Sequence, residues 1–121
     1  MRNPDAKLID FSELAGIITD NPKFLPSDLD MICERNGHFL VFEFKRGAEQ
    51  LSKGQEILLK QLAKTPKFTV VKVDGYSENG LLNIENLYYL NANEAFQYAG
   101  NGKERLIEFI QNWYKSVNYE R

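Results

Sequence analysis

The sequence has little cysteine, no long apolar run and no excess of basic charge. Cys33 is the only cysteine among 121 residues, which excludes an intramolecular disulfide and a cysteine-rich zinc site and favours a reducing, cytoplasmic location. No apolar run approaches the roughly 20 residues that span a bilayer. The polar start, Met1–Lys7, lacks the apolar centre of a signal peptide. We therefore expect a cytoplasmic protein that does not contact a membrane.

The net charge of −2 argues mildly against a nucleic-acid partner, because proteins that bind phosphates are usually basic. The charge is uneven, however: the segment 45–73 carries seven basic and two acidic residues. A local basic surface beside an acidic pocket fits DNA plus metal, and a solvated helix face is the alternative interpretation. With 43% hydrophobic and 26% charged residues, the chain is expected to form one domain, residues 1–121.

The apolar periodicity predicts an α/β fold, with a mixed sheet flanked by helices in the order α-β-β-α-β-(β)-α. A helix between the second and third strands implies a parallel, right-handed crossover. The expected helices are Phe11–Asp20, Ser52–Lys64 and Lys103–Val117, and the expected strands are Leu29–Arg35, His38–Lys45, Phe68–Val73 and one or two edge strands within Leu82–Leu90.

Local signals support these boundaries. Asp10-x-x-Glu13 and Ser52-x-x-Gln55 both have the pattern of a helix capping box. The pairs Asn36-Gly37, Asp74-Gly75 and Asn79-Gly80 are typical of turns, and the first would close a hairpin. The segment Ser77–Gly102 is harder to interpret, and an extra hairpin that carries specificity is one hypothesis.

The most informative stretch is Pro26-Ser27-Asp28-Leu29-Asp30, followed by Phe42-Glu43-Phe44-Lys45. An ionised Glu and Lys inside an apolar strand are costly unless they are paired or bind something. Alternation places Glu43 and Lys45 on one face with Phe39 and Val41, and the opposite face is wholly apolar. The hairpin brings Asp30, 13 residues earlier, close to Glu43.

On the first strand, Asp28 and Asp30 are expected to share a face with Ile32, so that three acidic groups converge at one edge of the sheet while Leu29, Met31 and Cys33 point away. Such carboxylates repel one another unless a cation neutralises them. Mg²⁺ or Mn²⁺ suits one or two carboxylates completed by water and phosphate. Lys45 could orient or deprotonate the attacking water or offset phosphate charge. The alternative is a Glu–Lys pair on a solvent-facing strand.

Pro-Ser-Asp-Leu-Asp, a turn and Phe-Glu-Phe-Lys, followed by a helix with Gln55, resemble the PD-(D/E)XK nuclease superfamily, and within it the small Holliday-junction-resolvase-like and VRR-type members. The resemblance covers Glu13–Val73. It implies a restriction-endonuclease-like fold in which Asp30 and Glu43 bind metal, the Phe44 carbonyl is a further ligand and Lys45 is catalytic. The acidic residues of the first motif are spread, which leaves either Asp28 or Asp30 as the essential aspartate. The separation of 13 residues from Glu43 favours Asp30, and Asp28 is then a second ligand or a cap of the strand entry.

The resemblance also assigns weaker roles. It suggests that Glu13 faces the metal, whereas its capping-box position is the alternative. It places Gln55 beside the active site, and the second capping box again offers a structural explanation. The inward stripe of that helix has Gln55 at its centre, where a polar amide needs a partner. Arg46, Lys67 and Lys72 are the predicted phosphate contacts.

The expected function is metal-dependent hydrolysis of DNA phosphodiester bonds, with RNA as a further option. The small domain favours a junction, flap or end as substrate, or specificity through dimerisation, which is common in the superfamily. One rival is a catalytically inactive module of the same fold that binds DNA or protein. Another is an interaction domain in which Glu43 and Lys45 form a surface pair.

Overall fold

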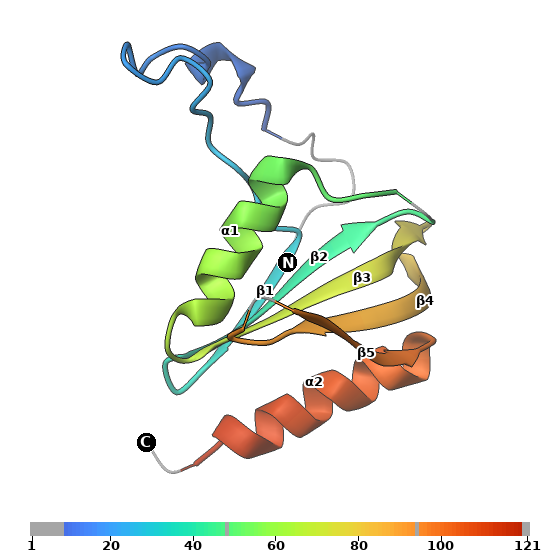
Figure 1. Ribbon diagram of the computed structural model, residues 1–121. Helices are drawn as coiled ribbons and strands as arrows, with labels where there is room; N and C mark the ends of the chain where they lie inside the picture. Colours follow the sequence, from blue (N-terminus) through green and yellow to red (C-terminus); the bar gives the residue numbers. More distant parts are fainter. Residues whose placement is uncertain (1–8, 48, 94, 120–121) are drawn as a thin grey trace.

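A five-stranded mixed sheet lies between two helices in the computed structural model, which describes residues 9–47, 49–93 and 95–119 (Figure 1). The polar start, Met1–Lys7, for which no signal peptide is predicted, lies outside these ranges. In chain order the elements are η1 Ser12–Leu14, β1 Met31–Arg35, β2 His38–Lys45, α1 Lys53–Lys64, β3 Phe68–Glu78, β4 Leu81–Leu90, β5 Phe96–Asn101 and α2 Lys103–Val117.

The strands lie in the order β1-β2-β3-β4-β5. Among the strands of the described ranges, only β2 and β3 are parallel, and α1 connects them as the crossover that the sequence predicts. The remaining pairs are antiparallel. The predicted hairpin is confirmed, with Asn36 and Gly37 both at positive φ, as a tight two-residue turn requires.

Each face of the sheet has its own apolar cluster. Beneath α2 the buried side chains are Leu40, Phe42, Val71, Val73, Leu87, Leu106, Trp113 and Val117. Beneath α1 they are Val41, Leu59, Val70 and Leu90. The alternation predicted for β2 is therefore confirmed, and the face that carries Glu43 is the one that α1 covers.

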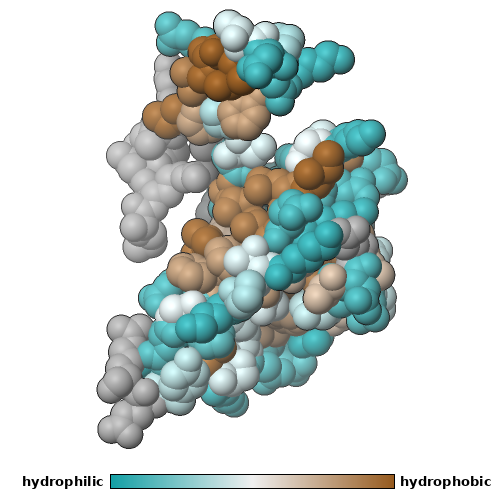
Figure 2. Space-filling model, turned by 60° about the vertical axis from the view of Figure 1, so that its left-hand side comes forward, coloured by the Kyte–Doolittle hydropathy of each residue, from teal (hydrophilic) through white to brown (hydrophobic). Residues whose placement is uncertain are grey.

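The predicted helix Phe11–Asp20 is wrong, because only the short 3₁₀ turn η1 forms there. Gly16 has a φ of +82°, which no α-helix contains. The side chains of Ile17 and Ile18 are 55% and 40% exposed, so no other part of the described structure covers the apolar face that their spacing would form on a helix. The capping box expected at Asp10 is also absent: Phe11 is the N-cap residue, and Asp10 Oδ1 accepts a hydrogen bond from the Ser12 amide. In Figure 1 this segment projects away from the sheet, and Figure 2 shows brown apolar side chains on the projection.

Three further expectations need correction. Asp74-Gly75 is not a turn but lies inside β3, at an irregularity in its register with β4. The segment Leu82–Leu90 belongs to one interior strand, since β5 continues the sheet beyond it. Leu29 packs into the cluster beneath α1, whereas Met31 and Cys33 pack beneath α2. The strand begins only at Met31, so alternation does not extend back to Leu29.

The segment 77–102 supplies the end of β3 and the strands β4 and β5. Asn79 and Gly80 form the predicted turn at positive φ. Across the described ranges, neither α-helix is long and apolar enough to cross a bilayer.

Candidate metal and catalytic site

The site lies where β2 approaches its C-terminal end beneath the first turn of α1. Glu43 is only 4% exposed, and its backbone neighbour on the parallel strand is Lys72. The antiparallel ladder of β1 and β2 ends at the pair Met31 and Phe42. Continuing that register by one step places Asp30 opposite Glu43. Adjacent strands lie about 4.8 Å apart, so the hairpin brings these two carboxylates together as the sequence predicts.

Asp30 is held by the backbone of β2. Its Oδ2 accepts a hydrogen bond of 2.8 Å from the Phe44 amide, while the side chain remains exposed to solvent. This bond fixes the carboxylate at the edge of the site. It also shows that Phe44 contributes its N–H group to Asp30, whereas the role expected for its carbonyl stays a prediction.

Glu43 has an unusual electrostatic environment. Burial, the charges of Asp30 and Asp28, and a side-chain hydrogen bond with Asp30 raise the pKa of Glu43 to about 7, whereas the attraction of Lys45 lowers it. A carboxyl with this pKa is about half ionised at neutral pH. Its ionised form needs a cationic partner more than an ordinary surface glutamate does.

The two oxygens of Glu43 differ in their surroundings. Oε1 accepts a hydrogen bond of 3.1 Å from Gln55 Nε2. Oε2 is buried and accepts no hydrogen bond from the residues that the structure describes, whereas the protonated form of Glu43 can bond to the Asp30 side chain. Buried carboxylate oxygens are normally satisfied, so Oε2 is the atom of this site best suited to receive a ligand.

Gln55 serves both of the roles between which the sequence left a choice. Its Oε1 accepts a bond of 3.1 Å from the Ser52 amide, and Ser52 Oγ accepts one of 3.2 Å from the Gln55 amide, which completes the capping box. The same side chain then reaches Glu43 through its Nε2. The capping box thus aims the amide of Gln55 at the buried carboxylate.

Lys45 lies two residues beyond Glu43 on the same strand and is half-buried. The positive charge of Lys45 attracts the Glu43 carboxylate and lowers the pKa of Glu43. The neighbour of Lys45 on β3 is Asp74, which is 9% exposed and forms an ion pair with Lys72. The Asp74–Lys72 pair was missed in the sequence, although polar residues at alternate positions of a β-branched run are the signal that marks it.

Asp28 and Glu13 are the two other acidic residues that the sequence assigns to the site. Asp28 is exposed, and it acts on Glu43 through its charge. Glu13 is exposed in η1, and the charges that shift the pKa of Glu43 come from other residues. Among the described residues, no three or more histidine, cysteine, aspartate or glutamate side chains gather as a metal cage. Two carboxylates, Asp30 and Glu43, therefore form the acidic centre.

The three predicted phosphate contacts lie in different places. Arg46 stacks its guanidinium 3.9 Å from the centre of the Tyr76 ring, and both line a cavity of about 450 Å³ that Asp30 also lines. Lys72 is paired with Asp74. Lys67 lies at the opposite end of the parallel strands, where its carbonyl accepts a bond from Phe39 at the start of β2. Arg46 is therefore the predicted phosphate contact that lines the same cavity as Asp30.

This donor set fits a hard divalent cation. Mg²⁺ is usually bound by one or two carboxylates, with water and substrate phosphate as the other ligands. Asp30 and Glu43 supply two carboxylates, one of which carries a buried oxygen that accepts no hydrogen bond from the described residues. An added divalent charge would favour the ionised form of Glu43 and offset its repulsion by Asp30.

Comparisons of the chain with protein-family models, curated proteins and solved structures find no match.

Proposed function

We propose that this protein is a divalent-metal-dependent nuclease of restriction-endonuclease-like fold. The observation that carries the proposal is the buried Glu43, whose Oε2 accepts no hydrogen bond from the described residues and whose pKa is raised to about 7 by burial and by Asp30. A lysine on the same face and a sheet edge open to solvent at Asp30 add the other parts that phosphodiester hydrolysis needs.

In this proposal Asp30 and Glu43 hold Mg²⁺ or Mn²⁺, and the Phe44 carbonyl is a further ligand. A bound divalent cation lowers the pKa of water and stabilises charge on a phosphate that is being displaced. Gln55 keeps Glu43 Oε1 in place through its hydrogen bond, so that Oε2 is presented in a fixed direction. This orientation is set by the capping box and so by the backbone of α1.

Lys45 orients the attacking water, accepts its proton or offsets the charge of the phosphate. It lies on the face of Glu43 rather than on the opposite apolar face, which places its ammonium on the same side of the sheet as the carboxylates. Arg46, which shares a cavity with Asp30, is the proposed contact to a neighbouring phosphate of DNA. We retain Asp28 and Glu13 as assisting residues.

The test is cleavage of labelled linear duplex, single strand, flap and four-way junction with Mg²⁺ or Mn²⁺, with EDTA as the control. Metal-dependent cutting of any one substrate supports the proposal and identifies the substrate shape. Binding of DNA without cutting would instead favour an inactive module of the same fold. The acidic net charge favours that second candidate, and the complete set of Asp30, Glu43 and Lys45 opposes it.

A further inference from the structure

A second cavity lies on the α1 face of the sheet, one strand away from Glu43. Its volume is about 300 Å³, and Gln50, Leu51, Glu56, Lys72, Tyr88 and Phe96 line it. Lys72 is the backbone neighbour of Glu43, and Glu56 follows Gln55 on α1. The cavity and the proposed catalytic site therefore share two walls, the first turn of α1 and the parallel strands.

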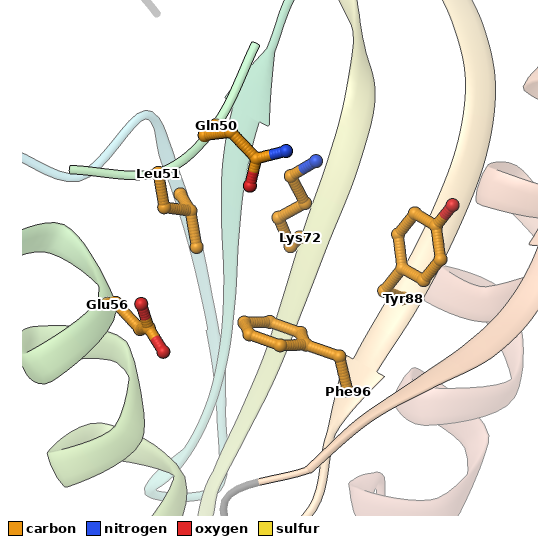
Figure 3. A pocket seen from close by; sticks show the side chains of 6 residues that line it. All are labelled: Gln50, Leu51, Glu56, Lys72, Tyr88 and Phe96. Atoms are coloured by element: carbon orange, nitrogen blue, oxygen red, sulfur yellow. The ribbon is translucent and has the colours of Figure 1, made fainter. Parts of the chain in front are cut away.

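The lining is built from two sides. In Figure 3, Leu51 and Glu56 project from α1 and the segment before it, whereas Phe96 and Tyr88 project from β5 and β4. The ring of Phe96 extends into the space between the two sides, and Gln50 and Lys72 lie at the upper end of this space in the view. The result is a slot with Leu51 and Glu56 on one side, aromatic rings on the other, and Gln50 and Lys72 at the upper end.

The charges that line the slot are balanced by near neighbours. Lys72 forms an ion pair with Asp74, and its ammonium lies 5.5 Å from the centre of the Tyr88 ring. Glu56 pairs with Lys60 at 2.8 Å. Because Lys72, the cation among the described lining residues, is already compensated, the slot suits an uncharged planar group better than a free phosphate.

We propose that this slot holds the unpaired base of a nucleotide next to the phosphate that is cut. The inference rests on the proposed nuclease function, which would place that phosphate at Glu43, and it extends that function to a substrate class: strands with an unstacked base, such as an end, a flap or a single strand. Phe96 and Leu51 enclose the base, and the amide of Gln50 at the upper end of the slot meets its polar edge.

The size and chemistry of the slot agree with this occupant. A volume near 300 Å³ is at the lower limit for ligand sites, which admits a base rather than a paired duplex. Aromatic side chains stack on any base, so such a slot favours single strands without strong sequence preference. Phe96 is 37% exposed, so its ring is accessible to a ligand.

The experiment compares the affinity for two fluorescent ten-nucleotide strands, oligo-deoxyadenylate and an abasic strand with the same phosphates, by anisotropy. The Lys45→Ala background keeps the strands intact. We expect the base-bearing strand to bind roughly tenfold more tightly, as one stacked base contributes. Phe96→Leu should remove this preference and Phe96→Tyr should retain it. Tyr114→Leu, an exposed aromatic residue on α2 at the other face, should leave it unchanged.

Equal affinity for the two strands, no binding of either, or an undiminished preference in Phe96→Leu would each overturn the slot as a base site. This readout is separate from cleavage. A protein that cuts DNA but shows no base preference keeps the nuclease proposal and loses this inference. A base preference that depends on Phe96 in a protein that cuts nothing would keep the slot and remove the catalytic role beside it.

Discussion

The amide of Gln55 and the carboxylate of Glu43 meet at 3.1 Å, and this single hydrogen bond joins the start of α1 to the buried end of β2. The same Gln55 closes the helix cap with Ser52. Gln55, which the sequence pattern marks as part of a helix cap, therefore also donates a hydrogen bond to a buried carboxyl group. Substitutions of Gln55 should change the stability of α1 and the position of Glu43 together.

The buried Glu43 should make the protein less stable as pH rises. Its pKa is about 7 in the folded chain and about 4.5 as its ordinary value, so between these values the folded state binds the proton more tightly. The stability contributed by the protonated form is complete below pH 4.5 and is lost as pH rises through 7. The expected loss is about 3 kcal/mol.

The measurement is the free energy of unfolding in urea across pH 4 to 9, for the metal-free wild type and for Glu43→Gln. The variant keeps the shape of the side chain and has no charge to bury, so the difference between the two proteins should open between about pH 4.5 and 7. If the free energy of unfolding changed with pH in the same way in both proteins, ionisation of the buried Glu43 would not be the cause of the loss of stability.

Divalent metal should reverse this penalty. Mg²⁺ or Mn²⁺ should raise the thermal midpoint of the wild type and leave Glu43→Gln unchanged, because the variant lacks the charge that the cation neutralises. Below pH 7 the apparent affinity should fall, up to tenfold per pH unit, since metal and proton compete for Glu43. Titration calorimetry at pH 6, 7 and 8 measures this, and an affinity independent of pH would contradict it.

Asp30→Asn separates the charge of Asp30 from its structural bond. The amide oxygen of asparagine can still accept the bond from the Phe44 N–H group, so the hairpin should remain intact. Removing the negative charge should lower the pKa of Glu43 and stabilise the metal-free protein at pH 8, while metal binding weakens. A pH series of unfolding experiments tests the first effect. A loss of stability at every pH would mean that the carboxylate is mainly structural.

Gln55→Glu and Ser52→Ala separate the two roles of Gln55. A glutamate at position 55 can still accept the bond from the Ser52 amide, but it places a second carboxylate against Glu43, so metal-free stability should fall most at high pH. Ser52→Ala removes only the cap and should cost about 1 kcal/mol at all pH values. Thermal unfolding at pH 5 and pH 8 distinguishes them, and an identical pH response would contradict the bond between Gln55 and Glu43.

The sequence predicted the parts of the fold that depend on local patterns. The helix Lys103–Val117 and the hairpin at Asn36-Gly37 follow from periodicity and turn chemistry, and both are present. It failed at Phe11–Asp20, where apolar spacing is helical but no partner surface covers it. Helix propensity alone does not hold such a segment, because most helical stability in proteins comes from packing.

The candidate site likewise has parts that follow from local sequence patterns and parts that depend on contacts between distant segments. Alternation and hairpin register were enough to bring Asp30 and Glu43 together and to put Lys45 on their face. The ion pair of Lys72 and Asp74 was missed, although the two residues alternate along the single strand β3. The slot around Phe96 was beyond prediction, because it depends on the register of β3 with β4 and on β5. Such contacts between strands distant in sequence leave little local trace.

The most direct test of the nuclease account is single-turnover cleavage of the preferred DNA by wild type, Lys45→Ala and Lys115→Ala, together with metal titration of each. Lys115, exposed in the last turn of α2, is the matched control and should leave the rate unchanged. Lys45→Ala should still bind metal but cut at least about 100-fold more slowly. Cleavage by Lys45→Ala at the wild-type rate would contradict the placement of the active site at Asp30, Glu43 and Lys45.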